Sequence, residues 1–160
     1  LTYALIWPNA PRQRHQAYRE ACQWLIDGFR TLQLELQFGD EACRTESANC
    51  FARSTAADLV DPNGVKRIGS AQRWQQGRLL QHGEIVLDPP AELWRSVFGQ
   101  EPPDAASASI PRQGLDRHLE KALRRQWSGL NWVEQPFSEQ EAQALGLSSS
   151  GSDDCIVSTT

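Results

Sequence analysis

A lysine followed by small residues gives this sequence its clearest chemical signal. Lys66 and Lys121 are the only lysines, although Lys and Arg together number 16. A compact ammonium can sit beside a carbonyl or phosphate oxygen as a point charge. The segment Gly69-Ser70-Ala71-Gln72 begins three residues after Lys66, and its small side chains let a ligand or another backbone come close. This spacing indicates a slot for an extended ligand beside a cation.

A second glycine-thinned segment follows in Gln81-His82-Gly83. If the two segments lie on adjacent strands, they form the two sides of one slot near Lys66. A structural explanation is also open, with Gly69 as an ordinary β-bulge and Lys66 as an exposed strand residue. For an isolated hairpin that explanation is the better one, so the slot needs support from a longer pattern.

The remaining reactive side chains do not form a metal-binding motif. No Cys-x-x-Cys pair occurs, and the histidines are scattered, so no metal site is expected. Nothing indicates secretion, which favours free thiols over disulfides. The residues concerned are Cys22, Cys43, Cys50, Cys155, His15, His82 and His118.

A three-stranded antiparallel meander is predicted to position the lysine and the glycines. A short strand at 58–60 leads into Asp61-Pro62-Asn63-Gly64, a strong turn signal because Pro presets φ and Asn-Gly accepts positive φ. Strands at 65–72 and 78–87 follow, each with alternating side chains.

Helices and loops are predicted around this meander. The apolar spacing of three and four predicts a helix over 15–34. Ser138 and Glu141 have the spacing of a capping box and open a helix that reaches residue 145. The other predictions are strands at 1–7, 34–38 and 131–134, helices at 91–98 and 113–127, loops at 39–57 and 99–110, and a disordered polar tail at 148–160.

The longer pattern resembles the lipoate–protein ligase A family, particularly its octanoyltransferase branch. That family has a lysine, then Gly-Ser-Ala-Gln, then Leu-Gln-His-Gly and an apolar strand that ends in Leu-Asp. Here these are Lys66, 69–72, 80–83 and 85–88. The likeness covers about residues 1–90, and residues 91–145 only in general character.

The resemblance implies a fold and a domain organisation. The fold is α+β, a largely antiparallel sheet packed with helices, like class II aminoacyl-tRNA synthetases and biotin synthetases. The family's upstream motif of two arginines, Gly-Gly and His is absent from this sequence. We therefore expect residues 1–147 to be a partial catalytic domain without its N-terminal part, followed by the tail at 148–160.

The resemblance also implies an activity, the transfer of an octanoyl or lipoyl group to a lysine of a lipoyl domain. Lys66 matches the family lysine that contacts the acyl carbonyl, and Cys50 falls at the place of the nucleophilic cysteine of the octanoyltransferase branch. Gly69, Ser70, Ala71 and Gln72 would line the acyl slot, with His82 and Gly83 opposite them. His82 as a structural hydrogen-bonding residue is an equal alternative.

Donor, acceptors and cofactors follow from the same resemblance. The donor would be acyl carrier protein, and the acceptors lipoyl domains of 2-oxoacid dehydrogenase E2 subunits or the glycine-cleavage H protein. The thioester route needs no cofactor. Two alternatives remain open, an ATP-dependent ligase that uses ATP and Mg through an acyl-adenylate, and a non-catalytic fragment or binding module.

Composition and charge limit the other functions. The net charge of −4 argues against a general nucleic-acid binder. No apolar run is long enough to cross a bilayer and no signal peptide is evident, so a cytoplasmic protein is expected. Arg67, Arg73 and Arg78 form a possible docking patch for an acidic carrier protein, and solvated strand ends are an equally good explanation.

Overall fold

The computed structural model describes residues 1–39, 51, 54–106, 110–144 and 155–159. The chain divides into two compact units, Leu1–Leu123 and Arg124–Thr160, which are described separately. The first unit has helices α1 (Arg14–Arg30), α2 (Ala91–Phe98) and α3 (Leu115–Gln126, whose end lies in the second unit). Its strands are β1 (Thr2–Pro8), β2 (Gln37–Phe38), β3 (Leu59–Val60), β4 (Lys66–Gln75) and β5 (Arg78–Ile85).

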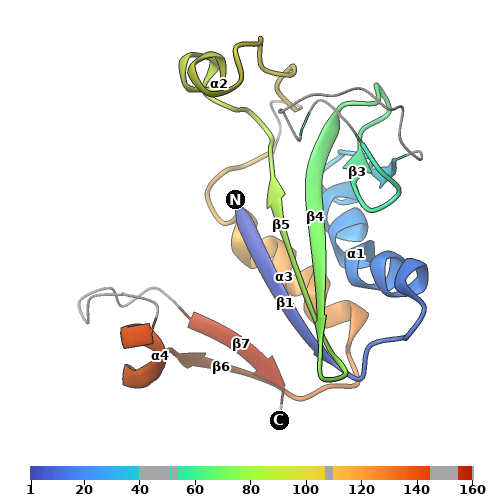
Figure 1. The fold of residues 1–160 in the computed structure, drawn as a ribbon, viewed down its shortest axis with the longest axis vertical. Helices are drawn as coiled ribbons and strands as arrows, with labels where there is room; N and C mark the ends of the chain where they lie inside the picture. Colours follow the sequence, from blue (N-terminus) through green and yellow to red (C-terminus); the bar gives the residue numbers. More distant parts are fainter. Residues whose placement is uncertain (40–50, 52–53, 107–109, 145–154, 160) are drawn as a thin grey trace. The chain divides into compact units, whose positions relative to one another are not determined.

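The five strands form one antiparallel sheet in the order β1-β5-β4-β3-β2 (Figure 1). The predicted meander is confirmed as β3, β4 and β5, and its first turn has Gly64 at a φ of 78°. Two carboxylate bonds support that turn, because Asp61 Oδ1 accepts the backbone N–H groups of Asn63 and Val65. Gln76 and Gly77, both at positive φ, connect β4 to β5.

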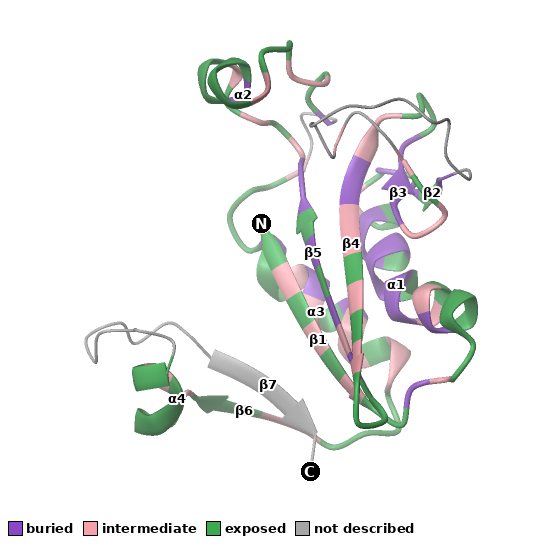
Figure 2. Ribbon diagram, viewed as in Figure 1, coloured by how far each residue is buried: buried purple, intermediate pink, exposed green. Residues whose placement is uncertain are grey.

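Helix α1 covers one face of the sheet with its apolar side. The helix ends at Arg30 rather than near residue 34, because Thr31 caps it and Gln33 takes a positive φ. The expected strand at 34–38 is correspondingly reduced to β2. The buried side chains of α1 are Ala17, Ala21, Cys22, Trp24, Leu25, Ile26 and Phe29 (Figure 2).

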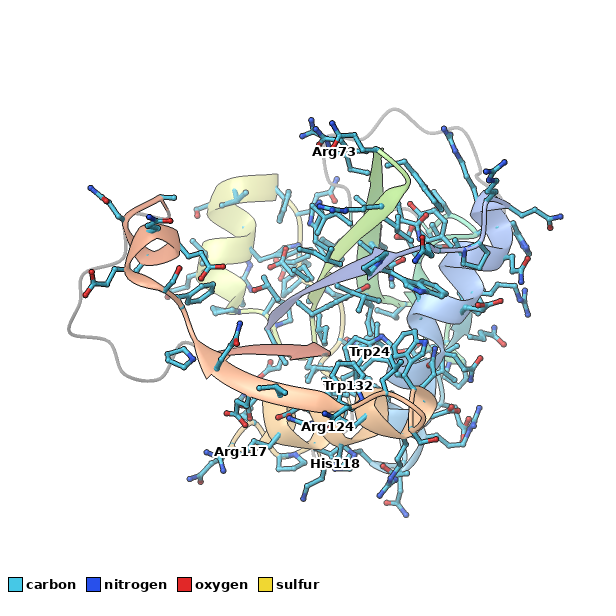
Figure 3. The ribbon with its side chains drawn as sticks, turned by 90° about the horizontal axis from the view of Figure 1, so that it is seen from below. Trp24, Arg73, Arg117, His118, Arg124 and Trp132 are labelled. Carbon is cyan, nitrogen blue, oxygen red and sulfur yellow. The ribbon has the colours of Figure 1, made fainter. Side chains whose placement is uncertain are left out.

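Helix α3 packs against α1 at a glycine. A Cβ on Gly28 would lie 2.9 Å from Leu119 Cδ2 and 3.2 Å from Ala122 Cβ. His118 adds polar contacts there, since its Nε2 lies 2.8 Å from Thr31 Oγ1 and 3.1 Å from the Gly28 carbonyl oxygen. Figure 3 shows His118 on α3, and Trp24 on α1. Small residues thus bring the two helices close together.

The second unit differs from expectation at its end. Its elements are β6 (Trp132–Pro136), α4 (Glu139–Ala144) and β7 (Cys155–Thr159). The predicted capping box opens α4, because Ser138 donates to Glu141 Oε2 through N and Oγ and accepts from Glu141 N. Residues 155–159 form a strand paired with β6, so the predicted disordered tail is wrong there. The pairing partner, which is distant in sequence, supplies backbone hydrogen bonds that a polar composition does not reveal.

The close approach of β1, β4 and β5 depends on the absence of a side chain at Gly83. A Cβ at this position would lie 2.6 Å from the Gly69 carbonyl oxygen and 2.6 Å from Tyr3 Cε1. We expect Gly83→Ala to lower the free energy of unfolding by about 1–3 kcal/mol, measured by urea denaturation, because backbone must shift. Gly129→Ala is the control, since nothing lies within 4 Å of its added Cβ. Equal stability of both variants would contradict the proposed crowding.

Candidate functional site

A β-bulge at the start of β4 sets the direction of Lys66. Leu59 pairs with Ile68 and Val60 pairs with Lys66, so Arg67 is the extra residue on β4. The side chains of Lys66 and Arg67 consequently reach different surroundings. This local irregularity follows from strand pairing and is not visible in the sequence.

The ammonium of Lys66 is held by a buried carboxylate. Lys66 Nζ lies 3.1 Å from Asp58 Oδ2, and the two side chains are only 10% and 5% exposed. The same oxygen accepts hydrogen bonds from Thr55 N and Thr55 Oγ1 at 2.8 and 3.0 Å. Asp58 Oδ1 accepts the backbone N–H of Ser70 at 3.4 Å. Asp58 thus ties the lysine to the backbone of the glycine-containing strand.

Gly69 and Phe51 complete the surroundings of Lys66. A Cβ on Gly69 would lie 3.0 Å from Lys66 Cε, 3.4 Å from Lys66 Nζ and 3.7 Å from Phe51 Cζ. Lys66 Nζ lies 5.3 Å from the centroid of the Phe51 ring. Because Gly69 has no side chain, the side chain of Lys66 can occupy the space next to it. Cys50, the neighbour of Phe51 in the chain, lies outside the described residues.

The strand register divides the other predicted site residues between two faces of the sheet. Gly69 pairs with Glu84 and Ala71 pairs with His82, and these residues share the face of Lys66, here called the open face. Thr2, Ala4 and Ile6 of β1 lie exposed on this face too. The opposite face, toward α1, carries Ser70, Gln72 and Gly83.

A buried polar network lies on the α1 side of the sheet. Gln81 is fully buried, and its Nε2 donates to Tyr3 Oη at 3.0 Å and to Cys22 Sγ at 3.2 Å. Gln81 Oε1 accepts from Gln72 Nε2 at 2.7 Å, and Tyr3 Oη lies 2.8 Å from Ser70 Oγ. Burial raises the pKa of the Tyr3 phenol well above its ordinary value. The Tyr3 phenol therefore stays protonated. The network fixes β1, β4 and β5 against helix α1.

The expected arginine patch is wrong at Arg67. Its side chain is 3% exposed, with Nε and Nη2 both 2.8 Å from Asp61 Oδ2 and Nη1 donating to the Asp104 carbonyl at 2.6 Å. The bulge turns this residue into the structure, where it joins the 61–64 turn to the segment before α3. Arg73 and Arg78 are exposed, and both lie near the turn that joins β4 to β5. Figure 3 labels Arg73.

An apolar cavity of about 680 Å³ begins beside Phe51, and we call it the α2 cavity. Phe51 connects it to Lys66, because the Phe51 ring also packs edge-on against Trp94 at a centroid distance of 5.9 Å. The volume is in the range of ligand-binding pockets. The walls are Leu1, Phe51, Glu84, Ile85, Val86, Leu87, Asp88, Pro89, Pro90, Leu93, Trp94, Val97, Phe98, Arg112, Leu115 and Asp116.

Sequence reasoning missed Asp58, Gln81 and the α2 cavity. The sequence pattern assigns Asp58 only to the start of a strand, although an acid eight residues before the only lysine of this region is a usable signal. The same pattern assigns Gln81 only to a segment that interrupts a strand. Its buried position depends on the pairing of β1 with β5, which joins segments far apart in the chain.

Among the residues that the structure describes, no group of three or more His, Cys, Asp or Glu side chains is arranged to hold a metal ion. Their helices also include none with the length and apolar character needed to span a membrane.

The Asp58–Lys66 pair predicts a specific pattern of stability. Removing one partner leaves a buried charge without its counterion, so Asp58→Asn should cost about 3 kcal/mol of unfolding free energy. Replacing both residues, as Asp58→Asn with Lys66→Met, should recover much of that loss because no buried charge remains. Urea denaturation of the two single variants and the double variant measures the coupling. Additive losses would show that the side chains do not interact.

The surroundings of Cys22 predict an unreactive thiol. The side chain is fully buried on α1, and burial raises the pKa of its thiol above the ordinary value. Since the thiolate is the reactive form, iodoacetamide should leave Cys22 unmodified in the native protein at neutral pH. Mass spectrometry of the digested protein reads the result, with urea-unfolded protein as the labelled control. Labelling of native Cys22 at the rate of an exposed cysteine would be inconsistent with this environment.

Known proteins share both the sequence and the fold. The family described as "Biotin/lipoate A/B protein ligase family" matches residues 1–89. Octanoyltransferase LipM of Geobacillus kaustophilus is 37% identical over 143 residues, which is 82% of this chain and 48% of that protein. Octanoyltransferase LipM of Kyrpidia tusciae is 30% identical over 161 residues, 91% of this chain and 57% of that protein. The chain thus spans about half the length of these relatives.

Solved structures agree in fold at low sequence identity. A lipoate-protein ligase A bound with ATP superposes with a TM-score of 0.67 at 13% identity, over 89% of this chain and 57% of that one. A bi-partite lipoate protein ligase of Thermoplasma acidophilum, from a study of that ligase and its E2 lipoyl domain, gives a TM-score of 0.59 at 14% identity, over 89% of this chain and 56% of that one. The expected α+β fold is confirmed, and this chain belongs to the biotin/lipoate A/B protein ligase family.

Proposed function

We propose that this protein transfers an octanoyl group to the ε-amino group of a lysine on a lipoyl domain, with an amide as the product. The relatives at 30–37% identity are octanoyltransferases, which supports this reaction. The observation that carries the proposal is the position of the Lys66 ammonium. It lies 3.1 Å from the buried carboxylate of Asp58 and next to Gly69 of the family motif.

Lys66 acts in this proposal as a directed hydrogen-bond donor to the acyl carbonyl oxygen. The ion pair with Asp58 fixes the position of the ammonium, whose N–H groups are hydrogen-bond donors. Because Asp58 also balances the positive charge, the net field on nearby groups is smaller than that of an isolated lysine. Negative charge that develops on the carbonyl oxygen during acyl transfer is stabilised by such a preorganised donor. Asp58 is then a positioning residue, since it fixes the ammonium without contact to the substrate.

The acyl slot runs along the open face. Gly69 and Ala71 on β4 offer little side-chain bulk, and His82 lies directly across from Ala71 on β5. An acyl chain laid over these residues keeps its carbonyl at the Lys66 end. Ser70, Gln72 and Gly83 are on the other side of the same strands, so we now assign them to the support of the slot. Their hydrogen bonds and the absence of a side chain at Gly83 hold the strands close together.

Cys50 is the proposed nucleophile. It lies outside the described residues, and the proposal rests on the family pattern and on its neighbour in sequence, Phe51, whose ring centroid is 5.3 Å from Lys66 Nζ. The Cys50 thiolate attacks the octanoyl carbonyl and a new C–S bond forms. The C–S bond to the carrier breaks, and the carrier leaves as a thiolate that takes up a proton from water. The acceptor amine then attacks the same carbon, the C–N bond forms, and Cys50 is released with the proton lost by the amine. Cys22 is unsuited to this role, because it is buried and its pKa is raised.

The thioester route is supported over ATP-dependent ligation by the pattern of similarity. The octanoyltransferases match in sequence, whereas the ligases match in fold at 13–14% identity. We propose acyl carrier protein as the donor and lipoyl domains of E2 subunits, or the glycine-cleavage H protein, as acceptors. A ligase would instead require ATP and Mg with free octanoate or lipoate.

The route predicts a covalent intermediate in the full-length protein. Incubation with octanoyl-acyl carrier protein should add one octanoyl mass at Cys50, labile to hydroxylamine. Cys50→Ser should lower transfer to a lipoyl domain by at least about a thousandfold, because no nucleophile remains. Mass spectrometry of intact and digested protein measures both results.

A matched control separates this mechanism from its alternatives. Cys43 is close to Cys50 in the sequence and lacks the family match, so Cys43→Ser should retain transfer. Full activity of Cys50→Ser with strict dependence on ATP would establish the ligase mechanism instead. A folded protein that transfers no acyl group under either condition would indicate a binding module.

A further inference from the structure

The α2 cavity has one end at the proposed reaction site. Phe51 in its wall has its ring centroid 5.3 Å from Lys66 Nζ, and Glu84 in its wall is the register partner of Gly69. Side chains directly opposite on antiparallel strands have Cβ atoms about 5 Å apart. A Cβ at Gly69 would be 3.4 Å from Lys66 Nζ, so Glu84 lines the cavity from a position next to the surroundings of Lys66. A group bound at Glu84 is therefore beside the place assigned to the acyl carbonyl.

The side chains that line the α2 cavity carry a net negative charge. Its wall holds the acidic side chains of Glu84, Asp88 and Asp116 and one basic side chain, that of Arg112. Asp88 forms an ion pair with Arg112, so their charges offset each other. Glu84 and Asp116 are exposed, and they favour a cation and disfavour phosphate groups. A nucleotide or a phosphorylated carrier arm fits these charges poorly.

The apolar wall of the cavity is partly open to solvent. Leu93 and Val97 on α2 are 61% and 63% exposed, which is unusual for large apolar side chains beside a pocket. Trp94 between them is 8% exposed, and its indole Nε1 has no hydrogen-bond partner in the described part of the chain. A ligand with apolar groups would cover the two aliphatic side chains.

We propose that the α2 cavity binds the acceptor protein, through its target lysine and the peptide segment on either side of it. The lysine stem lies along the apolar wall, and its ammonium pairs with Glu84 next to the acyl site. Backbone carbonyl groups of the segment supply acceptors, and its apolar side chains cover Leu93 and Val97. This assignment rests on the proposed function and adds to it the site where the acceptor enters, beside Phe51.

Binding without turnover tests the proposal directly. Full-length protein that carries Cys50→Ser is titrated with an unmodified E2 lipoyl domain in a calorimeter, so no acyl transfer occurs. Glu84→Gln should weaken binding about threefold, and Glu84→Gln with Asp116→Asn about tenfold, as expected for exposed ion pairs. Glu92→Gln removes a negative charge from α2 at a position outside the cavity lining, and this variant should bind as the parent protein does. A lipoyl domain with its target lysine replaced by Met should lose the dependence on Glu84.

Each outcome supports or overturns the assignment. Unchanged affinity in the double variant, or equal losses in Glu92→Gln, would overturn it, as would no measurable binding of the lipoyl domain. Displacement of the domain by ATP with no effect of Glu84→Gln would identify a nucleotide site instead. A failure of the thioester mechanism is detected in a separate experiment. Acyl transfer by the Cys50→Ser protein tests only the chemistry, and the calorimetric binding result does not depend on it.

Discussion

The buried pair of Asp58 and Lys66 is the constraint around which this structure is organised. A lysine ammonium taken out of water costs several kcal/mol unless a counterion and hydrogen bonds replace its hydration. Asp58 supplies the counterion and is itself held by Thr55 and by the backbone of Ser70. The lysine is therefore fixed in a place where Gly69 leaves room for it.

The face of the sheet toward α1 differs from the open face because a buried hydrogen-bonded network occupies it. There the side chains of Tyr3, Gln81 and Cys22 join β1, β5 and α1 in one hydrogen-bonded network. A buried network of this kind is favourable only when its members are paired, and pairing fixes one arrangement of the strands. Helix α1 is thereby joined to β1 and β5, the strands that also form part of the open face. Gly83 lets Tyr3 and the Gly69 backbone approach, so glycine serves packing at one position and the site at another.

Much of the local structure follows from short patterns in the sequence. The turn at 61–64, the β3-β4-β5 meander, helix α2 and the capping box of α4 all depend on neighbouring residues, and the structure confirms them. The pairing of β1 with β5 and of β6 with β7 joins distant segments, and composition carries little information about such partners. The disorder expected near residue 155 was wrong for that reason.

The sequence by itself determined which chemistry is available, because Lys66, the glycines around it and the Leu-Gln-His-Gly segment carry the family pattern within some twenty residues. Tertiary structure alone decided how these groups are used. Strand alternation places Gly69, Ala71 and His82 on one face and Ser70, Gln72 and Gly83 on the other. The bulge at Arg67 turns that guanidinium inward to Asp61 and leaves Lys66 with Asp58. Such choices depend on register and burial, which arise only when distant segments of the chain pack together.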